Sequence, residues 1–234
     1  MKVAIIPARG GSKRIPRKNI REFCGKPMLA YPIESAQQSG CFDRIVVSTE
    51  DPAIAKLAIS YGAEVPFIRP AELADDYTGT TPIIRHALQQ LIAQGDKPEY
   101  CCCIYATSPL LQPEALQQAL QTLLQHPDID FVFSAARFSF PIQRALLQSS
   151  SGGVIPFDPD SIRKRSQDLP ATYHDAGQFY WGKTTAWLDP QAGVFSERSR
   201  MQILPDHLVQ DIDTEDDWQR AELLYKVLQQ DGFK

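Results

Sequence analysis

The chain has no marked excess of either charge and no long apolar run. Its 234 residues include 24 Lys and Arg against 28 Asp and Glu, a net charge of −4. This balance argues against a protein that binds nucleic acid over its whole surface. No stretch approaches the roughly 18 consecutive apolar residues that a membrane-spanning helix needs. The first apolar run reaches Arg9 too early for a secretory signal. We therefore expect neither a nucleic-acid partner nor a membrane partner.

The cysteines are few and lack paired spacing. None of the five stands in a C-x-x-C arrangement, which argues against a zinc site or a disulfide framework. Cys101, Cys102 and Cys103 follow one another in an apolar run, where a strand would point neighbours to opposite faces. Free cysteines of this kind are typical of a reduced compartment, so we expect a cytoplasmic location.

Two familiar phosphate-binding motifs are missing. A dinucleotide-binding turn needs G-x-G-x-x-G, and only Gly10–Gly11 follows the first apolar run. A P-loop needs G-x-x-x-x-G-K-[ST], but Gly25–Lys26 is followed by Pro27, and Ile20 stands where the first glycine belongs. Any nucleotide-binding loop in this chain must be of another kind.

Short apolar runs alternate with helical patterns through the first 135 residues. The pattern predicts strands over 2–7, 44–49, 64–68, 100–105 and 130–136, and helices over 27–39, 52–61, 81–94, 113–125 and 215–230. Strand–helix alternation of this kind predicts an α/β fold with a mainly parallel sheet and helices on both faces. The pattern is lost over 138–170, which we interpret as an insertion or arm within a single domain spanning 1–234.

Positive charge is concentrated in the turn after the first strand. Four cations, Lys13, Arg14, Arg17 and Lys18, follow the Gly10–Gly11 pair within eight residues. Ligands of doubly wound sheets bind beyond the carboxyl ends of the strands, and glycine lets the backbone approach them. Exposed N–H groups and cations suit phosphate oxygens. The alternative interpretation is a solvated basic loop.

Six motifs in order resemble one family. Residues 6–20 (IPARGGSKRIPRKNI), 25–27 (GKP), 42–49 (FDRIVVST), 69–74 (RPAELA), 106–110 (ATSPL) and 210–215 (QDIDTE) closely resemble the CMP-sugar synthetases that activate nonulosonic acids. The resemblance implies a Rossmann-like nucleotidyltransferase fold. It also implies transfer of CMP from CTP to a nine-carbon α-keto acid sugar, with release of pyrophosphate.

The resemblance assigns roles to residues at both ends of the chain. It implies that Arg9 and Lys18 hold the triphosphate and stabilise its charge, and that Asp211 and Asp213 bind Mg²⁺. Alternate residues of an extended segment share a side, so both carboxylates can face one site, and their oxygens suit Mg²⁺. The implied nucleotide contacts are Ala8, Arg9, Gly10, Gly11, Ser12, Lys18, Asn19, Arg69, Thr80, Thr81, Tyr105, Ala106 and Thr107.

Some of these positions have a second interpretation. The family commonly has Gln where Tyr105 stands, and Thr80 and Thr81 could equally cap the helix that follows them. Asp216 and Asp217 are interpreted as capping residues of the last helix, where negative charge suits the helix dipole. The nucleophile of the implied reaction is the anomeric hydroxyl of the sugar, and no general base is assigned.

Segment 173–181 (YHDAGQFYW) occupies the place where sialic-acid enzymes carry a pattern like F-R-P-N-G-A-I-Y. It is similar to the pseudaminic acid branch of the family, and a changed set of polar groups should change which sugar is accepted. The implied sugar contacts are Tyr173, His174, Asp175, Gly177, Gln178 and Phe179. Arg165 and Gln167 of the arm would reach a neighbouring subunit's site, which implies a homodimer.

Several alternatives stay open or are disfavoured. Asp211–Thr214 is similar to the D-x-D-x-T motif of haloacid-dehalogenase-like phosphatases, but that motif needs Thr where Glu215 stands. A silent nucleotide-binding module would lack a phosphate cation or a metal carboxylate, and both are present. Among sugars, N-acetylneuraminate, legionaminate and KDO remain possible. His86 is interpreted as structural, and His174 could be a core histidine.

Overall fold

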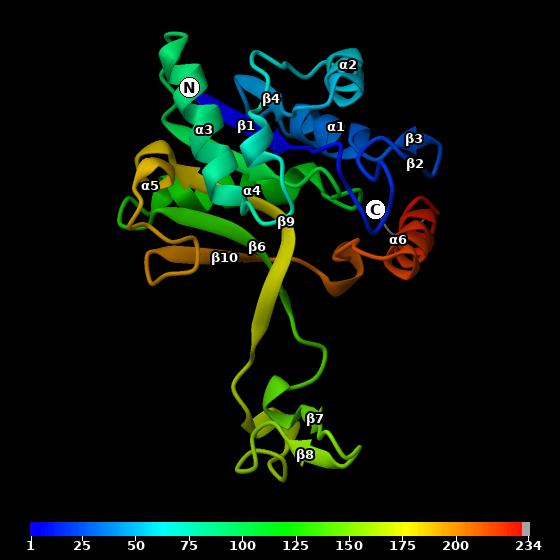
Figure 1. Cartoon of the computed structure of the whole chain (residues 1–234). Coiled ribbons are helices and arrows are strands. Elements are labelled where there is room, and N and C mark those ends of the chain that lie inside the picture. Colours follow the sequence, from blue (N-terminus) through cyan, green and yellow to red (C-terminus); the bar gives the residue numbers. More distant parts are fainter. Residues whose placement is uncertain (231–234) are drawn as a thin grey trace.

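The computed structural model describes residues 1–230, and its centre is a six-stranded sheet (Figure 1). The strands lie in the order β10-β6-β9-β5-β1-β4. Their bounds are Lys2–Pro7 (β1), Arg44–Ser48 (β4), Tyr100–Ile104 (β5), Phe131–Arg137 (β6), Tyr173–Lys183 (β9) and Ser199–Ile203 (β10). Strand β1 pairs in parallel with β4 and β5, and β10 pairs in parallel with β6, whereas β9 runs antiparallel to both neighbours. The prediction of a mainly parallel sheet is confirmed.

Helices cover both faces of this sheet, as predicted. Buried side chains of α1 (Ala30–Ser39), α2 (Pro52–Ser60) and α4 (Pro113–Gln125) pack with Ala4 and Ile6 of β1 on one face. Those of α3 (Thr80–Ala93) and α5 (Thr184–Leu188) pack with Val3 and Ile5 on the other. Because β1 is buried on both sides, its sequence is continuously apolar rather than alternating.

The differences between predicted and observed elements have local causes. The bounds of β1 and α4 are as predicted, but the strand expected over 64–68 is only a bridge between Val46 and Glu64. Strands β9 and β10 were not predicted. β10 is an edge strand in which apolar Met201 and Ile203 are separated by polar residues, and the first residues of β9 are polar because they lead out of the body. Neither strand therefore has the apolar run that marks β1.

The helix caps settle two of the open interpretations. Asp217 closes a capping box with Thr214 at the start of α6 (Glu215–Leu228), as predicted, whereas Asp216 makes no capping hydrogen bond. Gly79 is the N-cap of α3, and no side chain caps that helix, so Thr80 and Thr81 do not act as caps.

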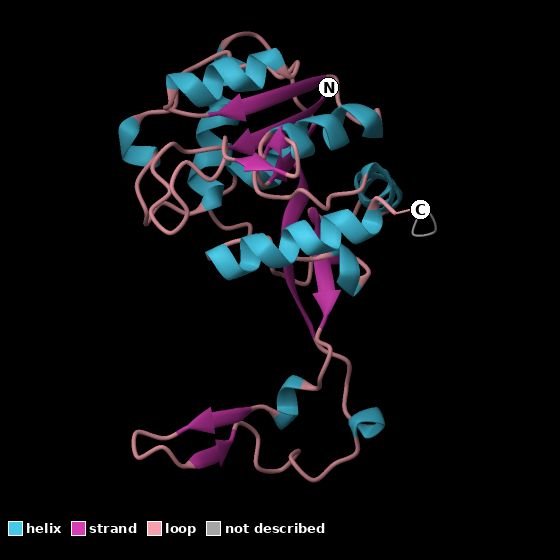
Figure 2. Ribbon diagram, turned by 90° about the vertical axis from the view of Figure 1, so that its right-hand side faces the viewer, coloured by secondary structure: helices cyan, strands magenta, loops and turns pink. Residues whose placement is uncertain are grey.

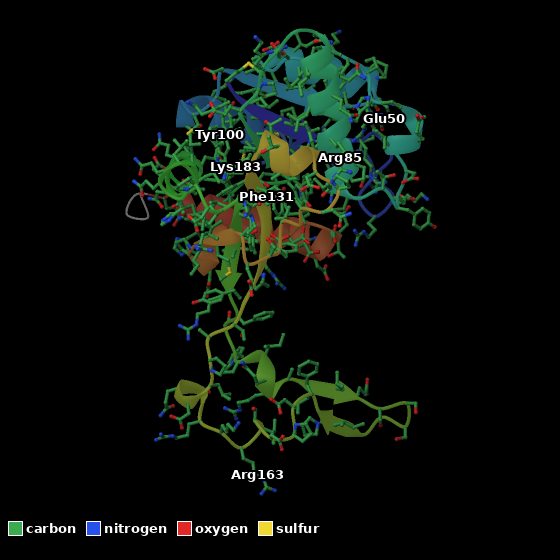
Figure 3. The ribbon with its side chains drawn as sticks, turned by 90° about the vertical axis from the view of Figure 1, so that its left-hand side faces the viewer. Glu50, Arg85, Tyr100, Phe131, Arg163 and Lys183 are labelled. Carbon is green, nitrogen blue, oxygen red and sulfur yellow. The ribbon has the colours of Figure 1, made fainter. Side chains whose placement is uncertain are left out.

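Residues 138–172 leave the body as an arm joined to it through the ends of β6 and β9 (Figures 1 and 2). The arm holds a hairpin of β7 (Leu146–Gln148) and β8 (Val154–Pro156) with short 3₁₀ turns at Ile142–Arg144 and Ser166–Asp168, and Arg163 lies at its far end (Figure 3). The arm exposes large apolar side chains: Phe140, Leu146, Leu147, Val154, Ile155 and Phe157. The irregular segment predicted over 138–170 is this arm.

Within residues 1–230, none of the helices combines the length and the apolar character that crossing a bilayer requires.

Candidate functional site

A cavity of about 690 Å³ opens beyond the carboxyl ends of β1 and β5. It is lined by four segments: the turn after β1, the loop before α3, the turn after β5, and the stretch before α6. The lining includes Asp213, predicted to bind the metal, and many of the residues predicted for the nucleotide: Arg9, Ser12, Lys18, Asn19, Arg69, Thr80, Tyr105, Ala106 and Thr107. This is the edge of a doubly wound sheet where ligands bind.

A small apolar cluster brings the two ends of the chain together at this cavity. Ile15 of the basic turn and Ile212 of the C-terminal segment are fully buried in one cluster with Phe23 of β2 (Glu22–Phe23) and Trp218 of α6. The short strand β3 (Lys26–Pro27) pairs with β2 beside them. Because Ile212 points inward, the residues on either side of it point the other way, toward the basic turn.

Charged side chains next to Ile212 contact cations of the basic turn on either side of Ile15. Nζ of Lys18 donates to the backbone oxygen of Ile212 at 2.5 Å and lies 3.5 Å from Oδ1 of Asp213. Nη2 of Arg14 lies 2.8 Å from the same oxygen. Asp211 does not line the cavity, but its charge acts on Lys18 and Asp213. The basic turn and the segment around Ile212, 194 residues apart at the contact of Lys18 with Ile212, therefore lie against each other beside the cavity.

Burial shifts the pKa values of Lys18 and Asp211. It lowers the pKa of Lys18, and the charges of Asp213 and Asp211 oppose that effect. It raises the pKa of Asp211, and the neighbouring charge of Asp213 raises it further. No cluster of three or more His, Cys, Asp or Glu within residues 1–230 could hold a metal ion. A cation bound by this aspartate pair would take its remaining ligands from a substrate or water.

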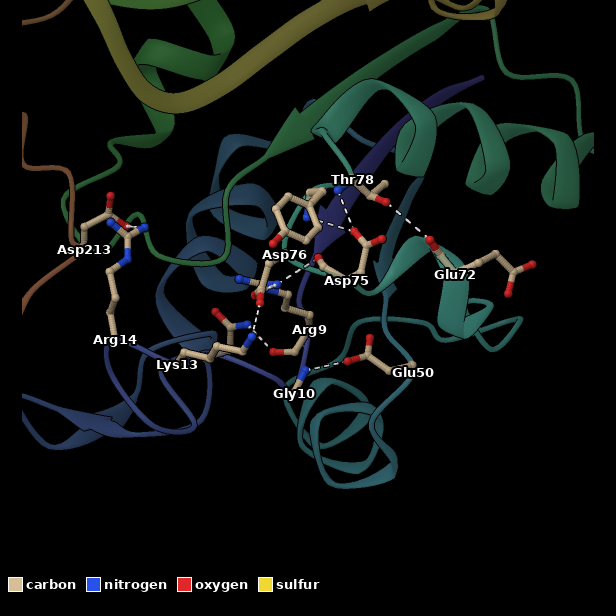
Figure 4. A network of polar contacts seen from close by, with 12 residues as sticks. Arg9, Gly10, Lys13, Arg14, Glu50, Glu72, Asp75, Asp76, Thr78 and Asp213 are labelled. Carbon is tan, nitrogen blue, oxygen red and sulfur yellow. Dashed lines mark hydrogen bonds and ion pairs between the residues drawn. The ribbon is translucent and has the colours of Figure 1, made fainter.

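Another carboxylate, that of Asp76, contacts the first residues of the basic turn (Figure 4). Asp76 lies between two cations, with Oδ1 2.6 Å from Nη1 of Arg9 and Oδ2 2.5 Å from Nζ of Lys13. The same Arg9 nitrogen donates to the backbone oxygen of Asp75 at 2.8 Å. The hydrogen bonds from Lys13 and Arg9 lower the pKa of Asp76. This contact was not predicted, because nothing in the sequence motif shows which side chains of the loop over 74–79 point toward the turn.

The backbone of the turn leaves donors unused. The N–H of Ala8 donates to Ser48 O at 3.0 Å, and that of Gly10 donates to Oε1 of Glu50 at 2.7 Å. The amide of Asn19 holds the turn from the inside by donating to Arg9 O at 2.9 Å. No hydrogen bond from residues 1–230 occupies the N–H groups of positions 11, 12 and 13. Successive free N–H groups suit an anion.

A second cavity, of about 300 Å³, shares Thr80 and Tyr105 with the first. The two shared side chains contact each other, with 3.0 Å between Oγ1 of Thr80 and the Tyr105 hydroxyl oxygen. Asp175 lines this second cavity, where its Oδ2 accepts from the Tyr180 hydroxyl at 2.5 Å and its Oδ1 from Gly177 N–H at 2.9 Å. The rest of the lining is Thr81, Trp187, Val194 and Phe195, and the last three were not predicted.

Most of the other residues predicted for the sugar lie elsewhere. Phe179 has no exposed surface, and Gln178 is buried with its amide donating to Leu208 O at 2.5 Å. His174 is exposed and packs on Phe138 where the arm begins, so it is not a core histidine. Tyr173 starts β9 beside it.

The two predicted arm residues lie within the arm and at its junction with the body. Arg165 forms an ion pair with Asp168 at 2.7 Å, and Gln167 lines a cavity of about 500 Å³ at the junction of arm and body. Neither residue lines the two cavities at the end of the sheet. His86 is partly buried, with its ring edge-to-face against Phe67, as expected of a structural histidine.

The sequence model of a family described as "Cytidylyltransferase" matches residues 3–230. The chain belongs to the cytidylyltransferase family. It is 45% identical to a pseudaminic acid cytidylyltransferase of Campylobacter jejuni serotype O:2, over 99% of each chain. It is 32% identical to N-acylneuraminate cytidylyltransferase A of Danio rerio, over 94% of this chain and 49% of that protein.

A solved structure of CMP:2-keto-3-deoxy-manno-octonic acid synthetase complexed with CTP has the same fold. Its TM-score is 0.72 at 16% identity, with 97% of this chain and 98% of that chain covered. The expected nucleotidyltransferase fold is thereby confirmed.

Proposed function

We propose that this cytidylyltransferase transfers CMP from CTP to the anomeric hydroxyl of pseudaminic acid and releases pyrophosphate. The observation that carries the proposal is the meeting of the basic turn with Asp213 at one cavity. The 45% identity over almost the whole length to an enzyme named for pseudaminic acid supports the choice of sugar.

CTP occupies the larger cavity in this proposal. The free N–H groups after Gly10 and the side chains of Arg9 and Lys18 hold the triphosphate, with Lys13 and Arg14 close by. The base lies toward Thr80 and the Tyr105–Thr107 turn. Ala8 is fully buried, and its N–H is bonded within the fold, so we place it behind the site rather than in it.

Asp211 and Asp213 fit a divalent metal, and we propose Mg²⁺. They offer hard oxygen ligands beside the cations that hold the triphosphate, and their mutual repulsion would be relieved by a bound cation. Two carboxylates leave coordination positions for phosphate oxygens and water, which is how Mg²⁺ is usually bound at such substrates. When bound, the ion supplies charge neutralisation at the triphosphate.

The sugar binds on the side of the second cavity, next to Tyr105 and Asp175. The bond between its anomeric oxygen and the α-phosphorus forms as the bond from that phosphorus to the bridging oxygen of pyrophosphate breaks, and the hydroxyl proton passes to water. Lys18 and Arg9 stabilise the charge that develops on the leaving group. Asp175 is held by Tyr180 and Gly177 with its carboxylate at the cavity, where it can accept a hydrogen bond from the sugar.

We further propose that the enzyme is a homodimer formed through the arm. Phe140 is 83% exposed and Val154 67%, and the other large apolar side chains of the arm are more than half exposed or close to it. Exposure of several large apolar side chains on one segment is characteristic of a protein interface. In a dimer, Arg165 and Gln167 would approach the partner subunit's sugar site.

Pyrophosphate release tests the proposed reaction. The enzyme, CTP and Mg²⁺ are combined in turn with pseudaminic, N-acetylneuraminic, legionaminic and 2-keto-3-deoxy-manno-octonic acids. The highest kcat/KM is expected with pseudaminic acid. Equal or better turnover of N-acetylneuraminic acid would contradict the choice of sugar. If no acid released pyrophosphate, the chain would be a silent nucleotide-binding module.

A further inference from the structure

We propose that Glu50 is a positioning residue that fixes two separate parts of the nucleotide cavity through one carboxylate. The inference rests on the proposed binding of CTP there. Glu50 comes two residues after the end of β4, and its side chain contacts Gly10 of the glycine turn (Figure 4) and the side chain of Arg69. It does not itself line the cavity.

Each carboxylate oxygen of Glu50 holds a different segment. Oε1 accepts the N–H of Gly10 at 2.7 Å, and Oε2 accepts from Nη2 of Arg69 at 2.5 Å. A backbone hydrogen bond also joins the same two segments, because Arg69 N–H donates to Thr49 O at 3.0 Å. Arg69 lines the cavity whereas Glu50 lies behind it, so Glu50 acts on the ligand only through its two partners.

The turn can approach Glu50 closely because residue 10 is a glycine. A Cβ atom at this position would lie 2.5 Å from Oδ2 of Asp51. Asp51 cannot move away freely, because its Oδ1 caps α2 by accepting from the N–H groups of Ala53 and Ile54. Glycine therefore lets the turn dock against Glu50 and Asp51, and this docking commits the Gly10 N–H to Glu50. The N–H groups that remain for an anion are those of the next three residues.

The other contact of Glu50 is a buried charge pair. The Arg69 side chain is 1% exposed, and Glu50 is the only carboxylate paired with it among residues 1–230. A buried guanidinium without its partner is strongly unfavourable, so the position of Arg69 depends on Glu50. Loss of the Glu50 charge would therefore disturb Arg69 and, through the shared carboxylate, the glycine turn.

The test is the substitution Glu50→Gln, with Glu64→Gln as the matched control. Gln keeps an oxygen for Gly10 but presents an amide without charge to Arg69. Glu64 lies 2.5 Å from Arg44 at the opposite end of β4, away from the cavity, and Arg44 also pairs with Asp96. The measurements are the Kd of CTP by calorimetry without sugar, the KM of each substrate, and the melting temperature.

We expect Glu50→Gln to weaken CTP binding by about tenfold, the scale of effect that supporting residues have on the groups they orient. The KM of the sugar should stay within about twofold of wild type, and Glu64→Gln should leave CTP binding unchanged. Glu50→Asp, which keeps the charge but is too short to reach both partners, should show the same loss specific to CTP. It also serves as the second variant if the amide destabilises the fold.

Two results would overturn the inference. The first is wild-type affinity for CTP in both folded variants. The second is an equal rise in both KM values that follows the fall in melting temperature, which would mark a purely structural residue. If the wild-type protein itself bound no CTP, the proposed function would fail, and that result is distinct from a failure of the variants.

Discussion

The two cavities that share Thr80 and Tyr105 are built from different chemistry. In the larger one, each cation of the basic turn that lines it already has a carboxylate within 4 Å, either Asp76 or Asp213. The smaller one has a single carboxylate, Asp175, set among aromatic and apolar side chains. The larger cavity is suited to exchanging one set of negative charges for another, and the smaller one to selecting a ligand by shape and a few hydrogen bonds.

This difference predicts which substitutions affect which substrate. The ion pairs of Arg9 and Lys13 with Asp76 are at least partly solvated, and such pairs contribute little energy, so an incoming triphosphate can displace them. Asp175 is held by two hydrogen bonds and does not have to move. We therefore expect charge changes in the larger cavity to act on CTP and changes at Asp175 to act on the sugar.

The largest expected effect is that of Asp213→Asn. Removing one of the two carboxylates proposed to bind the metal should lower kcat at least about hundredfold, because the charge on the triphosphate is then poorly neutralised. Asp216→Asn is the matched control, since Asp216 is exposed in the first turn of α6 and lines neither cavity. Full Mg²⁺-dependent pyrophosphate release by Asp213→Asn would remove this residue from the metal site.

Asp175→Asn should affect the sugar alone. The amide keeps the size of the side chain but loses its charge and one acceptor, so the KM of the sugar should rise about tenfold. The Kd of CTP, measured without sugar, should stay at the wild-type value. A loss of CTP affinity in this variant would contradict the proposal that the larger cavity binds CTP and the smaller one binds the sugar.

A smaller change of opposite sign is expected from Asp76→Asn. Without the carboxylate that occupies Arg9 and Lys13, CTP binding should become a few times tighter at low salt. The gain should shrink as the salt concentration rises, because salt screens the competing ion pairs of the wild-type protein, which the variant lacks. Weaker binding of CTP would show that Asp76 supports the site rather than competes for it.

The smallest expected effect concerns stability. Burial and Asp213 raise the pKa of Asp211 above its unfolded value, so the folded state binds a proton more tightly. Stability therefore falls as the pH rises through this raised pKa and stays reduced at neutral pH. Asp211→Asn removes that cost. At pH 7 without metal, the melting temperature of the variant should be the same as that of wild type or up to about 1 °C higher. Turnover should nevertheless be lost. A clear fall in melting temperature would contradict this.

The sequence predicted the larger cavity better than the smaller one. The basic turn and the C-terminal aspartates are local motifs, and their meeting follows from the buried Ile15 and Ile212. Glu50 and Asp76 were missed because their contacts join distant segments that no motif pairs.

In the sugar segment, strand β9 was not predicted, so the direction of each side chain was unknown. A register shift opposite β9 between Phe133 and Ala135 changes the alternation of its side chains. There the Ser134 hydroxyl accepts the N–H groups of Gln178 and Phe179, and both side chains turn into the protein. In the sequence this irregularity is marked only by Gly177, whose φ of +62° lies in the left-handed region, and a single glycine does not show which side chains turn inward.

The most direct test of the account is the effect of Mg²⁺ on the affinity for CTP, measured by calorimetry in wild type and in Asp213→Asn. If the basic turn and the aspartates hold one triphosphate, Mg²⁺ should tighten CTP binding about tenfold or more in wild type, and this gain should disappear in the variant. The same gain in both proteins would mean that the aspartates and the triphosphate do not share a site.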